Sequence, residues 1–365
     1  MPQDATASGI YEWISRNCRP KTVDAASLRF ERMESQAAYS LPEIHQRLDH
    51  RDPAHWHHRG MIWDYVLSME GAERVLDVGP GDGWPSLLIA RHVKEVVGIE
   101  PGPNRVQACR ANAQRLRVRN ARFEEMSACE LGFRPGSFGG VVAATSIEQT
   151  PDPTAALGEV FRVLKVGGVF RLTYEAYEDI AEPVREAISI RTGSKGSYLI
   201  DYVVAWTKKA EERAYLLEIV PITDGNRKRL DMWAKRCESD AYPHRDPRLE
   251  RGLVSTIKVI RRPEILQASV CRLRHFKTQS LIRTLERIGF ADVRPVAGGG
   301  WVAAQCGQEM IQSRRIEAAA PLMEEICRAA GRVGIGLVAQ RHGNVIMRKP
   351  RGRARRKREK PKRRR

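Results

Sequence analysis

The sequence is organised around one segment, Arg74-Val-Leu-Asp-Val-Gly-Pro-Gly-Asp-Gly-Trp-Pro-Ser-Leu-Leu-Ile-Ala90. Its first residues form a short apolar run, which is typical of a buried strand, and a turn with three glycines follows. From Ser86 onward the segment favours a helix, with Pro85 near its first position. In an open parallel sheet such a turn lies beyond the carboxyl end of the strand, where ligands meet unpaired helix N–H groups. The segment therefore predicts a ligand-binding turn in a doubly wound α/β fold.

The spacing of the glycines separates two classes of ligand. A dinucleotide site uses Gly-x-Gly-x-x-Gly, so that a pyrophosphate can lie on the helix terminus. Trp84 occupies the position of the third glycine here. The spacing therefore argues against a dinucleotide.

The pattern Asp77-x-Gly79-x-Gly81-x-Gly83 resembles motif I of the class I S-adenosylmethionine-dependent methyltransferases. Arg162-Val-Leu-Lys-Val-Gly-Gly168 resembles the segment that precedes the fifth strand of that family, with Val166 where proline is common. The resemblance covers residues 70–175 and a second patch at 278–297, and it is to the broad small-molecule type, the methyltransferase-11-like group. It implies S-adenosylmethionine as cofactor and a mostly parallel, Rossmann-like sheet of seven strands.

The resemblance also implies which residues hold the cofactor. Glu100 ends the second strand, and a carboxylate there can accept both ribose hydroxyls, although an acid before a helix also suits the helix dipole. Two positions depart from the family pattern. Where the family has an acid near the adenine, this chain has Ser127, and Glu125 or Glu130 could supply that acid instead. Where the family has an Asp after the Phe of the fourth strand, this chain has Gly139. The expected cofactor residues are Asp77, Gly79, Pro80, Gly81, Gly83, Glu100, Pro101, Met126, Ser127 and Thr145.

Composition adds limits to this interpretation. Residues 348–365 hold 13 Lys/Arg and one Glu, so this end supplies +12 of the net charge of +18. The basic tail at 351–365 has no large apolar residue, so we expect it to be disordered, with non-specific contact to nucleic acid or an anionic surface as an open possibility. The seven cysteines form no Cys-x-x-Cys pair, and no metal is expected. Neither a membrane-spanning run nor a secretory signal is evident, which predicts a cytoplasmic protein.

The remaining elements follow from local patterns. Residues 1–70 are expected to be a helical N-terminal cover, with helices at Ser27–Tyr39 and Leu41–Leu48. The methyltransferase domain is expected over 71–350, with 176–277 as an inserted lid. Within that lid we expect a helix at Ala181–Ile190, then a hairpin or two packed helices, whose aromatic residues favour a core over a substrate cavity. A helix capped by Thr278, and a last antiparallel strand at 343–349 or at Trp301–Gln305, complete the domain.

The acceptor side has no diagnostic motif. His55 and His57, with His58, belong to a histidine cluster expected on a loop beside Pro53. Its spacing fits no standard metal ligand set, so a polar surface is favoured and a general base is the alternative. Glu148 follows the fourth strand and is the third catalytic candidate.

These observations predict methyl transfer to a small-molecule acceptor that the sequence does not identify. Two alternatives remain. One is a methyltransferase directed at RNA or another macromolecule and recruited by the basic tail, and the other is a non-catalytic cofactor-binding protein. The sequence does not predict the oligomeric state.

Overall fold

The computed structural model describes residues 8–25, 28, 41–239, 251–339 and 343–351. Its larger sheet has seven strands in the order β11-β12-β6-β5-β2-β3-β4. All neighbours from β6 to β4 are parallel, and β12 is antiparallel to both of its neighbours. The predicted mostly parallel, seven-stranded, doubly wound sheet is therefore confirmed. The strands are β2 (Arg74–Val78), β3 (Glu95–Glu100), β4 (Ala121–Glu125), β5 (Phe138–Ala144), β6 (Leu164–Thr173), β11 (Ala291–Pro295) and β12 (Asn344–Arg348).

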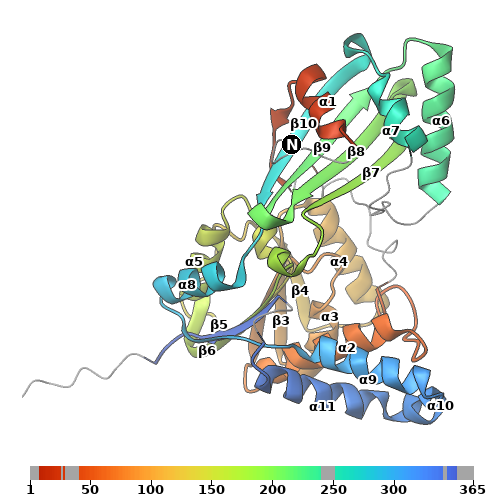
Figure 1. Cartoon of the computed structure of the whole chain (residues 1–365). Coiled ribbons are helices and arrows are strands. Elements are labelled where there is room, and N and C mark those ends of the chain that lie inside the picture. Colours follow the sequence, from red (N-terminus) through yellow and green to blue (C-terminus); the bar gives the residue numbers. More distant parts are fainter. Residues whose placement is uncertain (1–7, 26–27, 29–40, 240–250, 340–342, 352–365) are drawn as a thin grey trace, which may run out of the picture.

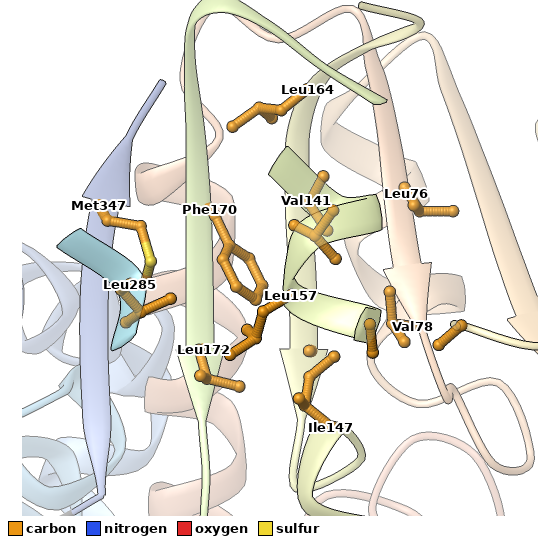
Figure 2. Close-up of a cluster of buried hydrophobic side chains, with 14 of the residues drawn as sticks. Leu76, Val78, Val141, Ile147, Leu157, Leu164, Phe170, Leu172, Leu285 and Met347 are labelled. Carbon is orange, nitrogen blue, oxygen red and sulfur yellow. The ribbon is translucent and has the colours of Figure 1, made fainter. Parts of the chain in front are cut away.

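Alternation of side chains along these strands builds two buried layers. Leu76 and Val78 of β2 join a cluster with α5 (Pro153–Val163) and α8 (Thr278–Ile288), as Figure 2 shows for Leu157 and Leu285. The intervening side chains of the strands point to the opposite face, which two further clusters cover. That face carries α2 (Pro53–Ser68), α3 (Ser86–Ile89) with η3 (Ala90–His92), and α4 (Pro103–Arg115).

Three helices between β11 and β12 pack beside α2 (Figure 1). They are α9 (Gly299–Gln312), α10 (Ile316–Ala319) with η9 (Ala320–Leu322), and α11 (Met323–Gly336). Trp301–Gln305 therefore lies in a helix, and the alternative that made it the last strand is wrong. Residues 344–348 form that strand, because their alternating apolar side chains are buried on both faces of the sheet.

A second sheet of five strands has the order β1-β10-β9-β8-β7. Its strands are antiparallel except that β1 is parallel to β10. They are β1 (Lys21–Thr22), β7 (Val184–Thr192), β8 (Tyr198–Trp206), β9 (Glu211–Ile219) and β10 (Ile265–Arg274). The turns and helices around them are η5 (Tyr177–Asp179), η6 (Ser194–Gly196), η7 (Thr207–Lys209), α6 (Asp224–Ser239), α7 (Arg251–Lys258) and η8 (Arg262–Glu264).

One face of this second sheet is apolar and covered. Tyr198, Tyr202, Trp206 and Tyr215 belong to its core, together with residues of α6, α7 and α1 (Ile10–Asn17). The core interpretation of these aromatics is confirmed, and of the two arrangements left open the hairpin is the one formed. Because α1 and β1 pack here, the first described N-terminal residues cover the second sheet, whereas residues 41–48 and α2 lie along the first.

The second sheet lies beyond the carboxyl ends of β5 and β6 (Figure 1). Glu175, just after β6, accepts a hydrogen bond from Arg185 Nη1 of β7 at 2.9 Å. The hydroxyl of Tyr177 donates to Glu212 Oε2 of β9 at 2.6 Å. The inserted region therefore contacts the edge of the first sheet where ligands bind in such folds. The boundaries 1–70, 71–350 and 351–365 remain predictions.

Three further local predictions are wrong. Residues 184–192 form β7 and not a helix, because pairing with β8 along its whole length outweighs the helix-favouring Glu, Arg and Ala. Leu41–Leu48 forms turns and one isolated bridge instead of a helix. Thr278 does not cap its helix: Lys277 holds that position, and the Thr278 hydroxyl accepts a hydrogen bond from Tyr174.

Two predictions concern residues that the structure does not describe. The helix expected at Ser27–Tyr39, apart from Leu28, lies outside the described residues, and so does the basic tail beyond Arg351. Within the described part, no helix is long and apolar enough to cross a membrane.

Candidate functional site

The glycine-rich turn between β2 and α3 adopts a backbone that needs its glycines. Gly79, Gly81 and Gly83 have φ values of 75°, 63° and 104°. A Cβ on Gly79 would also lie 2.5 Å from the Cβ of Ser146, which follows β5. The turn therefore brings bare backbone to the carboxyl edge of the sheet and lies directly against the next strand's end.

Glu100 faces this turn from the end of β3. Its Oε1 accepts a hydrogen bond from the Gly81 N–H at 2.6 Å, and the residue is only 8% exposed. Burial raises the pKa of the Glu100 carboxyl to about 7, against the lowering effect of the Gly81 N–H and of Arg105. A carboxylate held next to the turn in this way is suited to accept hydrogen bonds from a vicinal diol.

Asp77 lies at the other side of the turn and is fully buried. Its Oδ2 accepts a hydrogen bond from the Ser86 hydroxyl at 2.6 Å, which ties the strand to α3. Its Oδ1 is buried without a hydrogen-bond partner among the described residues. Burial raises the pKa of Asp77 to about 7. This oxygen is an acceptor that a bound polar group would satisfy.

A second acid in the turn, Asp82, is held by side chains from other parts of the chain. Arg105 Nη1 of α4 donates to Asp82 Oδ1 at 2.5 Å, and His45 Nε2 lies 3.0 Å from Asp82 Oδ2. The Asn112 amide donates to the Asp82 carbonyl at 2.9 Å. Sequence reasoning did not single out these contacts. The sequence did indicate that Asp82 would need a partner, because an acid between two glycines of a buried turn cannot remain unpaired. Which residue is that partner depends on the fold.

The remaining predicted cofactor residues line the same edge. The Met126 N–H donates to the Glu100 carbonyl at 2.9 Å, which sets Met126 and Ser127 directly beyond β4. Ser127 is exposed, and its Oγ accepts from the Cys129 N–H at 3.2 Å. Thr145, at the end of β5, has a φ of 52° and donates its N–H to the Thr173 carbonyl. The structure thus gathers the predicted residues from the ends of four neighbouring strands.

The histidine cluster lies on α2 and not on a loop, because Asp52 caps that helix and Pro53 begins it. Both ring nitrogens of His55 are engaged: the Asp49 N–H donates to Nδ1 at 2.7 Å, and Gln46 Nε2 lies 2.8 Å from Nε2. His57 packs against Gly300 of α9, and burial lowers its pKa. Within the described residues, no group of three or more His, Cys, Asp or Glu side chains is placed to hold a metal ion.

His58 is the member of this cluster nearest the turn. Its ring lies 5.7 Å from the Trp84 ring, measured between centroids. Burial and the neighbouring His57 and His55 lower the pKa of His58 to about 4. At neutral pH the side chain is therefore an uncharged neighbour of Trp84.

Glu148 lies in η4 (Ile147–Gln149), directly after β5. Its Oε1 accepts a hydrogen bond from the Glu175 N–H at 3.2 Å, whereas its Oε2 is buried without a partner. Burial raises the pKa of Glu148 to about 7, and the charge of His275 opposes this shift. His275 was missed by sequence reasoning because it follows β10, far along the chain.

Comparison with known proteins assigns the central part of the chain. Residues 76–172 match the family described as Methyltransferase domain. A 2-methyl-6-phytyl-1,4-hydroquinone methyltransferase of Oryza sativa subsp. japonica is 30% identical over 144 residues, which are 33% of this chain and 43% of that protein. The uncharacterized methyltransferase YcgJ of Bacillus subtilis is 34% identical over 99 residues, 27% of this chain and 39% of that protein.

Among solved structures, the sugar N-methyltransferase KedS8 from Streptoalloteichus is 14% identical, with a TM-score of 0.43 over 83% of this chain and 89% of that one. The chain spans less than half the length of the two curated relatives.

Proposed function

From the premise that residues 76–172 are a class I methyltransferase domain, we propose that this protein is an S-adenosylmethionine-dependent methyltransferase acting on a small molecule. One observation carries the proposal. A turn with three glycines at positive φ lies at the carboxyl edge of a parallel sheet, against a buried carboxyl from the next strand. This arrangement suits a ligand with a ribose and an amino-acid end.

The residues of the site fit this cofactor. Glu100 would accept the ribose hydroxyls, and the backbone of Gly79 and Gly81 would approach the amino-acid end. The unpartnered Oδ1 of Asp77 supplies a further buried acceptor. Met126 and Ser127 would lie near the adenine, with Pro80, Gly83, Pro101 and Thr145 shaping the edges.

When bound, S-adenosylmethionine supplies a sulfonium methyl group that a nucleophile can attack in line. The protein's own contribution is to hold the acceptor and the methyl group at contact distance, which can account for much of the rate. Among the three predicted catalytic residues, Glu148 is the one we retain. His55 has both nitrogens engaged, and His57 faces α9.

A small-molecule acceptor is supported by the name of one relative, a 2-methyl-6-phytyl-1,4-hydroquinone methyltransferase. The test is transfer of the tritiated methyl group of S-adenosylmethionine into compounds of a small-metabolite extract by the purified chain. We expect labelled product from the wild type and from Glu95→Ala, and at least tenfold less from Glu100→Ala.

Glu95 is the matched control because it lies on the same strand and pairs with Arg74 and Arg122 away from the turn. Equal labelling by both variants, or none by the wild type in extracts of several sources, would count against the proposal.

We propose a cytoplasmic location on sequence grounds alone, and the location is tested by fractionating cells that produce the protein.

The basic tail is the second feature proposed on sequence grounds alone. Contact of the basic tail with nucleic acid or an anionic surface is tested by removing residues 351–365, which should abolish binding to RNA while leaving methyl transfer unchanged.

A further inference from the structure

A buried polar cluster occupies the junction between the two sheets. It consists of Glu148 after β5, Tyr177 after β6, Glu212 on β9 and His275 after β10, all less than a tenth exposed. β10 packs against η4, and the charge of His275 acts on Glu148 although the two residues follow strands of different sheets. The cluster therefore exists only when the inserted region is in place over the first sheet.

The His275 ring is held firmly on one side. It stacks on the Tyr177 ring with 3.9 Å between centroids and 10° between planes, and its Nε2 lies 3.4 Å from Glu212 Oε2. The Tyr177 hydroxyl donates to that same oxygen at 2.6 Å. The ring is thus fixed in position by contacts that leave its hydrogen-bonding capacity unused.

Two buried side chains, His275 and Glu148, have polar atoms without a hydrogen-bond partner. Neither ring nitrogen of His275 has a hydrogen-bond partner among the described residues, and neither has Oε2 of Glu148. Buried polar atoms of this kind are rare in folded proteins, because each loses its contact with water without a replacement. Two such groups in one buried cluster, close enough for the charge of one to act on the other, indicate a place where a polar molecule binds.

The place is adjacent to the turn that we assign to the cofactor. Ser146, two residues before Glu148, donates its hydroxyl to the Val78 carbonyl and would touch any Cβ on Gly79. Glu148 therefore lies at the same carboxyl edge of the sheet, just beyond β5, the strand that pairs with β2. An acceptor held there would lie beside the reactive end of the cofactor.

We propose that Glu148 and His275 act as a pair on a hydroxyl acceptor during methyl transfer, in which the Glu148 carboxylate takes the hydroxyl proton and His275 positions the acceptor; this rests on the proposed function. As the new O–C bond forms, the C–S bond of the sulfonium breaks and its electron pair stays on sulfur. The hydroxyl proton passes to Glu148, which releases it to water after the product leaves. A thioether or carbon nucleophile without an acidic proton would not need these groups.

The electrostatic surroundings suit a proton acceptor that works near neutral pH. Burial is the main cause that raises the pKa of Glu148 to about 7, while the Glu175 N–H and the charge of His275 lower it and the charge of Glu175 raises it. Glu175 is itself paired with Arg185 of β7, and the pKa of Tyr174 is raised by burial and also by the charge of Glu148. A base whose pKa lies near the working pH accepts a proton most effectively.

The test uses the full chain with tritiated S-adenosylmethionine and five probes: catechol, 4-hydroxybenzoate, benzyl alcohol, benzylamine and thiophenol. We expect transfer to at least one of the three hydroxyl compounds. Glu148→Gln and His275→Gln should each lower kcat on it by roughly a hundredfold or more, with the cofactor Kd within twofold of wild type. The matched controls Glu95→Gln and His92→Gln should leave kcat unchanged.

A second measurement does not need an acceptor. Infrared difference spectra should show a carboxyl band that titrates near pH 7 and is absent from Glu148→Gln. Its midpoint should rise in His275→Gln, because the charge of His275 lowers the pKa of Glu148.

The outcomes separate the two proposals. No transfer to a hydroxyl compound, wild-type kcat in both variants, or an unmoved infrared midpoint would each overturn the proposed pair of Glu148 and His275. Loss of cofactor binding by the wild-type chain would instead overturn the proposed function. Binding without hydroxyl transfer leaves the methyltransferase assignment in place and removes only the acceptor class.

Discussion

Three buried carboxyls lie at the carboxyl ends of adjacent strands of the larger sheet. Asp77, Glu100 and Glu148 follow or end β2, β3 and β5, and burial raises the pKa of each to about 7. A fold maintained for stability alone would gain from replacing such groups, since burying a carboxylate is costly. Perturbed acids gathered at one edge therefore indicate a site selected for binding and chemistry.

These pKa values give a pH dependence of stability with a definite sign. Between the ordinary carboxyl pKa and about 7, the folded state binds more protons than the unfolded state, so the free energy of unfolding falls as pH rises. We expect the ligand-free protein to lose stability from pH 5.5 to 8, and Glu148→Gln to lose less over the same range. Urea unfolding at several pH values measures both slopes. Equal slopes for the two proteins would contradict the raised pKa of Glu148.

A buried ion pair fixes α2 to the sheet. Arg171 of β6 is fully buried and donates through Nε and Nη2 to Asp64 Oδ2 of α2, and through Nη1 to the Val345 carbonyl. Removing one charge leaves the other buried without its partner, so we expect Asp64→Asn to lower the free energy of unfolding by about 3–5 kcal/mol. Chemical denaturation measures the change.

The apolar double variant is the control for this pair. Asp64→Leu with Arg171→Met removes both charges, and it should recover most of the stability that Asp64→Asn loses. If the double variant is as unstable as the single one, the loss comes from packing and not from an unpaired charge.

The sequence predicted site residues that lie close to the glycine-rich turn along the chain. The position of Glu100 follows from the length of one helix and one strand, and the structure places it against Gly81 as a carboxylate partner. The contacts of Asp82 with Arg105 and His45, and of Glu148 with His275, join residues from separate elements. Local spacing carries no information about such pairs, and only the packing of the elements brings them together.

At the scale of elements, α2, α9 and α11 cross at unusually close range. A Cβ on Gly60 would lie 2.5 Å from the Gly299 carbonyl oxygen, and one on Gly334 would lie 2.4 Å from backbone atoms of Gly298 and Gly299. These glycines allow the three helices to pack with their backbones in contact. The close crossing holds α2 against the face of the sheet that carries Asp77 and Arg171.

Two glycines of α11 provide a matched pair of variants. Gly334→Ala should lower the free energy of unfolding by about 1–3 kcal/mol or more, because backbone must move to admit the methyl group. Gly336→Ala meets nothing within 4 Å and should be neutral, or stabilising by up to about 1 kcal/mol. Thermal or urea unfolding measures both. Equal effects at the two positions would contradict the close crossing.

The elements that sequence patterns predicted correctly have strong local signals. Buried strands such as β2 and β5 are nearly continuous apolar runs, and α8 carries an apolar stripe that ends at Gly289, whose φ is 118°. The strand β7 was mistaken for a helix because its buried and partly exposed side chains include Arg and Glu. Its conformation is set by pairing with β8, which is a property of the assembled sheet.

At the scale of the whole molecule, an inserted antiparallel sheet closes over the ligand edge of a doubly wound sheet. The insertion begins where β6 ends and returns to the first sheet at α8, where the Thr278 hydroxyl accepts from Tyr174 at 2.7 Å. The N-terminal α1 and β1 complete it from the opposite end of the sequence. The first sheet thus carries the proposed cofactor turn, and both parts contribute groups to the proposed acceptor site.

The most direct test of this account is a calorimetric titration of the wild-type chain and Glu100→Gln with S-adenosylmethionine. The account predicts saturable binding at one site per chain, and binding weaker by roughly ten- to a hundredfold in Glu100→Gln, because hydrogen bonds from the ribose to a charged group are lost. No heat of binding with the wild type, or the same Kd for both proteins, would contradict it.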